Sequence, residues 1–299
     1  MKKFFSYFMM AMCLLGTSVV TSCGSDDDDN EGLKDLPYEA DAALYELVGN
    51  HIDKIAYIEL TTAGNYFIEH KSMVKSKAAT INVNDVEIPL PFATADKNIT
   101  RATQDNFEYG TFTKNDDGSY TLKDRNNDIL TIKSEGNNNY TITLGGNTYT
   151  ATRVNRNSSL TSIGQICRSW KMSKVYYRWN QSLVGGLQTN IEEEAGSYKD
   201  LMKKLEKRTG FTYGNSIQDF DYVSFNNTGS YIVKTENSID RDYWNWTGNK
   251  LYFSKSPDFG YDVTFDGSTM KLDYKMTIDM GAAGTATLEM GYEFYERLI

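Results

Sequence analysis

The chain has 299 residues and a formal net charge of -9. An acidic chain without a basic stripe does not suit a nucleic-acid partner, so nucleic-acid binding is not expected. With three cysteines, 40% hydrophobic and 13% aromatic residues, the protein is expected to be stabilised by apolar burial without an internal disulfide bond.

The first 30 residues have the order of an export signal. Lys2 and Lys3 precede an apolar run over 4–20 that is too short and wrongly flanked for a membrane-spanning helix. Small residues then lead to Cys23, and an acidic run follows. We therefore predict a signal peptide over 1–22 and, because adjacent carboxylates resist burial, a disordered tether over 23–34.

The sequence Val20-Thr21-Ser22-Cys23 departs from the commonest lipoprotein signal, which has Leu three residues before the cysteine and Ala or Gly just before it. Together with the acidic run it resembles the signal of Bacteroides-type surface lipoproteins. The resemblance implies that Cys23 carries the acyl chains that anchor the protein to the outer membrane. It also implies that the acidic run directs the protein to the cell exterior; this export signal consists of Ser25, Asp26, Asp27, Asp28 and Asp29.

An N-terminal β-meander domain is predicted over 35–154. Helical spacing of apolar residues over 37–49 predicts a short leading helix. Period-two alternation then predicts hairpins, and 81–90 predicts one strand with a bulge near 84–85 that ends at two prolines. Turn sequences at 115–118 and 145–147 continue the meander, and the polar stretch 155–162 marks the expected domain boundary.

A second domain is predicted over 163–299. It has one strong amphipathic helix over 197–208, which Ser197 caps and Gly210 ends. Eight segments alternate like strands, and a phase shift predicts a bulge near Ser173. Eight strands close an up-and-down barrel around side chains or one small ligand. We therefore expect a mainly β protein of two antiparallel β domains, the C-terminal one an eight-stranded barrel with an inserted helix.

Three short stretches, Ser169-Trp170, Phe225 to Tyr231 and Phe294 to Arg297, resemble the lipocalin-like domains of Bacteroides-type lipoproteins. The resemblance covers about 162–299 and implies a lipocalin-like barrel with Trp170 at its closed end, covered by Arg297 in a cation–π contact. Arg168 departs from the pattern, which prefers Gly there. Similar Gly-polar-Tyr turns in the first domain are consistent with a duplication or with reuse of a hairpin turn for local reasons.

Signals for catalysis are few. His51 and His70 lack the spaced partners of a zinc site, and the chain contains no nucleophile elbow or phosphate loop. Carboxylates such as Glu192, Glu193 and Glu194 do not single out a glycosidase pair. We expect no catalytic residues, metal or cofactor, and we expect Cys167 to be a small buried residue.

Aromatic residues are concentrated in the second domain. Most are expected to fill the barrel, and the remainder to line a ligand cavity. The candidate ligand-binding residues are Tyr177, Trp179, Tyr231, Trp244, Trp246 and Tyr261. We therefore predict a lipid-anchored cell-surface protein that binds a small apolar or glycan-derived ligand. The alternative is a non-catalytic structural or interaction accessory of an outer-membrane assembly, with a filled barrel.

Overall fold

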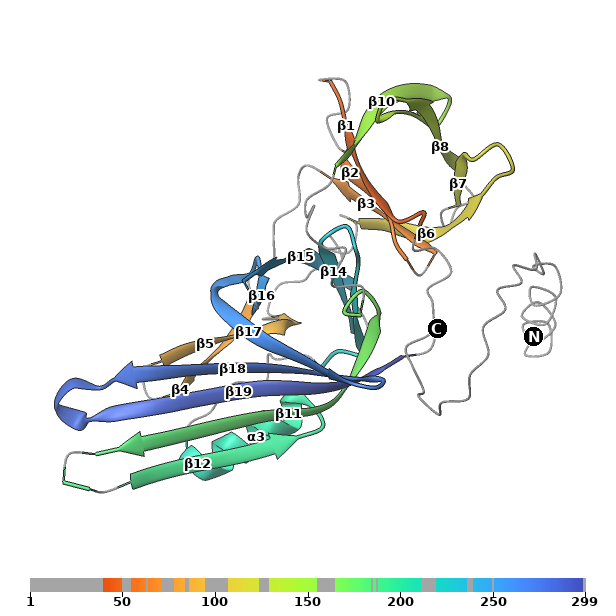
Figure 1. Ribbon diagram of the computed structural model, residues 1–299. Helices are drawn as coiled ribbons and strands as arrows, with labels where there is room; N and C mark the ends of the chain where they lie inside the picture. Colours follow the sequence, from red (N-terminus) through yellow and green to blue (C-terminus); the bar gives the residue numbers. More distant parts are fainter. Residues whose placement is uncertain are drawn as a thin grey trace, which may run out of the picture. The chain divides into compact units, whose positions relative to one another are not determined.

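The computed structural model describes residues 40–49, 55–62, 64–70, 78–83, 86–94, 107–123, 129–154, 165–183, 185–186, 188–210, 219–235, 239–248 and 250–297. The predicted signal peptide, Cys23, the acidic run, His51 and the predicted boundary at 155–162 lie outside these residues. Within the compact unit Gly32–Ile299 the strands form two antiparallel barrels (Figure 1). This confirms the expected mainly β architecture.

The first barrel is closed by eight strands in the order β1-β10-β9-β8-β7-β6-β3-β2. Alternate side chains from these strands form one hydrophobic core. The left-handed backbone of Asn137 (φ 50°) and Asn138 (φ 63°) makes the tight turn between two of them. The strands are β1 (Ala43–Leu47), β2 (Ile55–Leu60), β3 (Asn65–His70), β6 (Phe107–Lys114), β7 (Tyr120–Lys123), β8 (Ile129–Gly136), β9 (Asn139–Leu144) and β10 (Asn147–Val154).

The predicted leading helix is wrong where the structure describes it. Residues Ala43–Leu47 are strand β1, which pairs with both β2 and β10. Ala43 and Tyr45 are buried in the barrel core and Leu47 packs against it. This period of two prevails over the apparent helical spacing because the segment supplies the backbone groups that close the barrel on both sides.

The second barrel is closed by the pairing of its first strand, β11, with its last, β19. All eight strands predicted in this region are present. A ninth strand, β12, was not predicted; it pairs with residues 175–182 of β11, beyond the residues 169–170 that pair with β13. The strands are β11 (Ser169–Ser182), β12 (Gln188–Ala195), β13 (Tyr222–Phe225), β14 (Ser230–Lys234), β15 (Ile239–Thr247), β16 (Lys250–Phe253), β17 (Ser256–Asp266), β18 (Thr269–Asp279) and β19 (Thr285–Glu296).

Local sequence signals in this barrel are confirmed. The register of β11 against β19 shifts between Met172 and Lys174, which is the predicted bulge. Helix α3 (Tyr198–Thr209) begins after Ser197, whose hydroxyl accepts a hydrogen bond from the Asp200 amide at 3.1 Å. It ends at Gly210, which has a left-handed backbone (φ 76°). A short 3-10 helix, η2 (Gly281–Ala283), connects β18 to β19.

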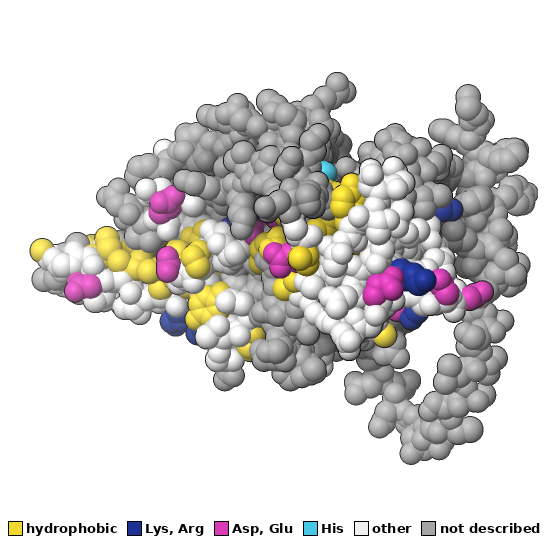
Figure 2. Space-filling view, turned by 90° about the horizontal axis from the view of Figure 1, so that it is seen from above, with side chains coloured by type: hydrophobic (Ala, Val, Ile, Leu, Met, Phe, Trp, Pro, Cys, Tyr) yellow, Lys and Arg dark blue, Asp and Glu magenta, His cyan; other side chains and the backbone are white. Residues whose placement is uncertain are grey.

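Strand β12 carries the Glu192–Glu194 run on an exposed edge. Arg178 of β11 lies 2.7 Å from Glu192, and Lys174 lies 3.7 Å from Glu194. On the other side of β11 the same two cations face carboxylates of β19. Seen from above, Figure 2 shows a separate group of basic and acidic side chains that lie next to one another among uncharged ones. Such exposed pairs add little stability, but they match β12 to β11 and keep the edge polar.

The segment predicted as one bulged strand is a hairpin of two strands, β4 (Ala78–Val83) and β5 (Val86–Thr94). Val83 pairs with Val86, so the chain reverses between these two residues, and the predicted bulge at 84–85 lies outside the described residues. The predicted stop at the prolines is also wrong, since β5 continues to Thr94. Each strand of this two-stranded sheet pairs on one side only, so the missing proline donors break no ladder on the other side.

This hairpin belongs to the core of the second barrel, although the sequence placed it in the first domain. Phe92 is 1% exposed, and Ile81, Ile88 and Leu90 join it in the same core. The Phe92 ring centroid lies 5.1–6.3 Å from those of six aromatic side chains, which are Phe220, Phe225, Tyr231, Phe253, Tyr292 and Phe294.

The contacts of Phe92 place it inside the barrel. Tyr231 belongs to β14, Phe253 to β16 and Tyr292 to β19, and these strands are spread around the ring of eight. A side chain that contacts all three must lie within the ring. The Tyr231 hydroxyl also donates a hydrogen bond to the Pro91 carbonyl oxygen at 3.3 Å. We call β4 and β5 the plug hairpin, because their apolar side chains enter the core of the second barrel.

Candidate functional site

The six aromatic ligand-binding candidates lie in or against the core of the second barrel. Trp246 is half-buried, and the other five are at most 2% exposed: Tyr177, Trp179, Tyr231, Trp244 and Tyr261. Burial is the main cause that raises the pKa of Tyr231 and of Tyr261 well above the ordinary value, so their phenols stay neutral. Tyr231 packs directly against the plug hairpin, and the other candidates belong to or pack against the same core cluster.

The expected contact between Trp170 and Arg297 is not formed. The Arg297 guanidinium lies 4.2 Å from the ring centroid of Tyr222. Trp170 is fully buried, donates its indole N–H to the Ile166 carbonyl oxygen at 2.9 Å and contacts Phe265. Arg168, the residue that departs from the family pattern, forms an ion pair with Glu296 at 2.8 Å. A cation–π contact is therefore present at this end, but on Tyr222.

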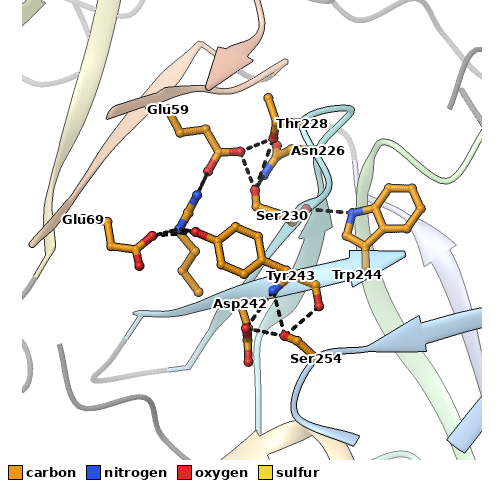
Figure 3. Close-up of polar contacts among 10 residues, drawn as sticks. Glu59, Glu69, Asn226, Thr228, Ser230, Asp242, Tyr243, Trp244 and Ser254 are labelled. Carbon is orange, nitrogen blue, oxygen red and sulfur yellow. Dashed lines mark hydrogen bonds and ion pairs between the residues drawn. The ribbon is translucent and has the colours of Figure 1, made fainter. Parts of the chain in front are cut away.

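A buried polar cluster joins the two barrels (Figure 3). Two carboxylates come from the first barrel, and one guanidinium, one phenol and two hydroxyls come from the second. We call this set the interbarrel cluster; it consists of Glu59, Glu69, Thr228, Ser230, Arg241 and Tyr243.

Arg241 is the centre of the interbarrel cluster. Its Nε donates to Glu59 Oε2 at 2.7 Å, its Nη2 lies 2.6 Å from the same oxygen, and its Nη1 pairs with Glu69. Tyr243 donates its hydroxyl to Glu69 Oε2 at 2.7 Å and accepts from Arg241 at 2.9 Å. Burial by itself lowers the pKa of Arg241. The negative charge of Glu59 is the first of the contributions that oppose this effect, and the net pKa lies above the ordinary value.

The second oxygen of Glu59 is satisfied by the turn between β13 and β14. Both Thr228 and Ser230 donate their hydroxyls to Glu59 Oε1. Asn226 in turn donates its side-chain amide to the Ser230 hydroxyl at 2.9 Å. Because Glu59 is 1% exposed and both of its oxygens are engaged, the cluster leaves it no room to act on a substrate. The chemistry of this set is that of a buried ion pair that fixes two surfaces together.

A surface pocket adjoins the interbarrel cluster through Tyr243. The hydroxyl of Tyr243 belongs to the cluster, while the residue itself lines a cavity of about 350 Å³ on β15, β16 and the start of β17. We call this cavity the aromatic pocket; its lining residues are Tyr243, Trp244, Asn245, Thr247, Tyr252, Phe253, Ser254 and Pro257. Trp244 is the one predicted candidate that reaches it.

In the part of the chain that the structure describes, no group of three or more His, Cys, Asp or Glu side chains has the arrangement of a metal site. No helix among those residues has both the length and the apolar character needed to cross a membrane.

Comparison with known proteins shows no family. No protein-family model matches the chain, and no curated protein matches it. A solved protein of unknown function from the DUF3598 family of Nostoc punctiforme is similar at 6% identity and a TM-score of 0.19, over 85% of this chain and 93% of that one.

Sequence reasoning missed most of the site. Glu59 and Arg241 are 182 residues apart, and no local pattern links them. One signal was present in the strand 239–247, where Arg241 follows the same alternation as Tyr243 and so shares its face. A cation at a strand position next to aromatic residues indicates a buried partner, but the pattern does not say which carboxylate supplies it.

Proposed function

We propose that the protein is a lipid-anchored, non-catalytic cell-surface protein that acts as a structural or interaction module of an outer-membrane assembly. The observation that carries the interaction role is the plug hairpin, with Phe92 among six aromatic side chains inside the second barrel. A barrel whose interior is occupied by its own chain has no central cavity for a carried ligand.

The sequence supports the proposed lipid anchor and the proposed location at the cell surface. Cys23 follows an apolar leader and precedes an acidic run, and two or more acyl chains on one residue suffice for stable membrane attachment. Metabolic labelling with an alkyne fatty acid tests this directly. We expect label on the wild-type protein and none on Cys23→Ser, and we expect protease added to intact cells to digest the labelled protein. An unlabelled wild-type protein, or one protected until the cells are lysed, contradicts this part of the proposal.

The filled interior is tested with the apolar fluorescent dye Nile red on the purified protein. We expect no saturable binding, because core side chains occupy the space that a lipocalin-type ligand would enter. Saturable binding that is lost when Trp179 or Tyr177 is replaced by Ala, with the fold retained, contradicts the proposal, since both side chains lie in the core of the second barrel.

A second candidate function is the binding of a small apolar or glycan-derived ligand. The aromatic pocket favours it, because lining residues such as Asn245 and Tyr252 alternate with the core residues of their strands and therefore lie on the outer face of the barrel.

A further inference from the structure

We propose that the aromatic pocket binds a neutral sugar. The inference names the ligand class of the second candidate function and rests on that candidate, but it does not depend on the lipid anchor or on a partner protein. The volume of the aromatic pocket, about 350 Å³, lies at the lower end of the roughly 300–1,000 Å³ that ligand sites span. The space therefore suits a ligand of one or two rings.

The pocket presents aromatic and apolar surfaces of the kind that pack on the C–H face of a sugar ring. Trp244 and Phe253 belong to the lining through their backbone, because each is at most 2% exposed and its side chain packs in the core on the opposite face of the strand. Tyr252, Tyr243 and the exposed Pro257 are the more accessible apolar members. Aromatic rings give large contact areas at a low cost in side-chain entropy.

The Tyr252 ring is held in place by the neighbouring strand. Tyr252 lies opposite Gly260 in the register of β16 and β17. A Cβ added to Gly260 would lie 2.6 Å from Tyr252 Cζ, so the ring covers the glycine backbone directly. Because the glycine provides this space, the phenol needs little reordering when a ligand arrives, which favours affinity.

The polar groups of the pocket divide into two sets. Those of the first set are already engaged: the Trp244 indole N–H donates to the Ser230 carbonyl oxygen at 2.8 Å, the Ser254 hydroxyl donates to Asp242, and the Tyr243 hydroxyl belongs to the interbarrel cluster (Figure 3). These bonds hold the residues of the pocket in position, so only the polar groups of the second set can bind a ligand.

The second set is available to a ligand. Among described residues we find no hydrogen-bond partner for the amide of exposed Asn245 or for the hydroxyls of Thr247 and Tyr252. Amides and hydroxyls each both donate and accept hydrogen bonds, as the hydroxyl groups of a sugar do. Every residue that lines the pocket is uncharged, so a charged ligand gains no ion pair there. Aromatic surface with neutral two-way hydrogen-bonding groups points to a neutral sugar.

The test is calorimetric titration of the purified protein with glucose, galactose, mannose, N-acetylglucosamine, maltose, cellobiose and lactose. We expect saturable binding of at least one of them, weakened about tenfold or more in Asn245→Ala and in Tyr252→Ala. Tyr295→Ala is the matched control, because Tyr295 is an exposed tyrosine (41%) of the same barrel outside the pocket lining. It should bind like the wild type.

The proposal is overturned if none of these sugars binds saturably, or if binding is unchanged in both pocket variants. If Tyr252→Ala loses its fold, Asn245→Ala decides, because its exposed side chain makes no contact on which folding depends. Glucuronate is the charged counterpart of glucose, and equal binding of the two contradicts a neutral site. These outcomes are separate from acylation of Cys23 and from Nile red binding, which test the proposed function.

Discussion

Replacement of Phe92 by Ala is the sharpest test of the plug hairpin. Removing a buried Phe side chain typically costs about 3–5 kcal/mol. Phe92 is 1% exposed and contacts six aromatic rings, and each such pair adds about 0.5–1.5 kcal/mol beyond area burial. We therefore expect a loss at the upper end of the range, about 4–5 kcal/mol. At a urea slope of about 2 kcal/mol/M this lowers the unfolding midpoint by roughly 2 M.

Tryptophan fluorescence makes the assay specific to the second barrel. All four tryptophans lie there, at Trp170 and Trp179 in β11 and at Trp244 and Trp246 in β15. The fluorescence transition in urea therefore reports unfolding of the second barrel, whereas the mutated residue lies in the sequence of the first domain. A hairpin that packed only on the first barrel would leave this transition nearly unchanged.

Phe112→Ala is the matched control for this experiment. Phe112 is 2% exposed and packs in the core of the first barrel, where it contacts Tyr120. It loses the same atoms as Phe92, but from the other core, so its effect on the tryptophan transition should be clearly smaller. If Phe92→Ala shifts that transition no more than Phe112→Ala does, or by less than about 1 kcal/mol, the reasoning about the plug is refuted.

Three further predictions concern the interbarrel cluster, a close backbone contact and a shifted tyrosine. Arg241→Met leaves the buried Glu59 and the partly buried Glu69 without their guanidinium and should lower the free energy of unfolding in urea by about 3–5 kcal/mol. Lys275→Met breaks only the exposed pair with Glu289 and should lower it by less than about 1 kcal/mol. Equal losses in the two variants contradict a buried cluster. Gly110→Ala places a Cβ 2.3 Å from the Lys123 carbonyl oxygen and should destabilise the fold by about 1–3 kcal/mol, which is measured as a lower Tm. In Gly196→Ala the nearest atom to the added Cβ is 3.7 Å away, so the Tm should change little. An equally small change of Tm in Gly110→Ala counts against this packing. Burial, and then the hydrogen bond to Asp41, raise the pKa of Tyr120 to about 12, so the stability that this phenol contributes is complete below pH 10 and is lost as the pH rises through 12. The difference in unfolding free energy between wild type and Tyr120→Phe should therefore shrink from pH 10 to pH 12, and a difference that stays constant is evidence against the shift.

Features set by local sequence were predictable. The cap at Ser197, the stop at Gly210 and the bulge at Ser173 each follow from residues within a few positions of the feature. The alternating strands of the second barrel were read correctly for the same reason. Strand β12 was missed because it lies on an exposed edge, and its face toward the core holds only Ile191 and Ala195, with Glu193 between them.

Features set by distant partners were not predictable. The apolar run of β5 indicates burial, but nothing within it says that Phe92 packs inside the second barrel and not the first. The segment over Ala43–Leu47 was assigned to a helix because spacing alone does not reveal two pairing strands. The same limit applies to Glu59 and Arg241, and to the outer-face cavity, which needs the register of Asn245 opposite Tyr252.

The plug hairpin also has a consequence for the order of folding. During synthesis β5 leaves the ribosome long before β19, and the second barrel closes only when β19 pairs with β11. Until then Ile88, Leu90 and Phe92 have no core to enter. The first barrel can close once β10 is made, but the hairpin must wait for the second barrel, and such long-range closure is slow and leaves apolar surface open to aggregation. A chain of this design is suited to having this hairpin shielded by chaperones until its last strand is available.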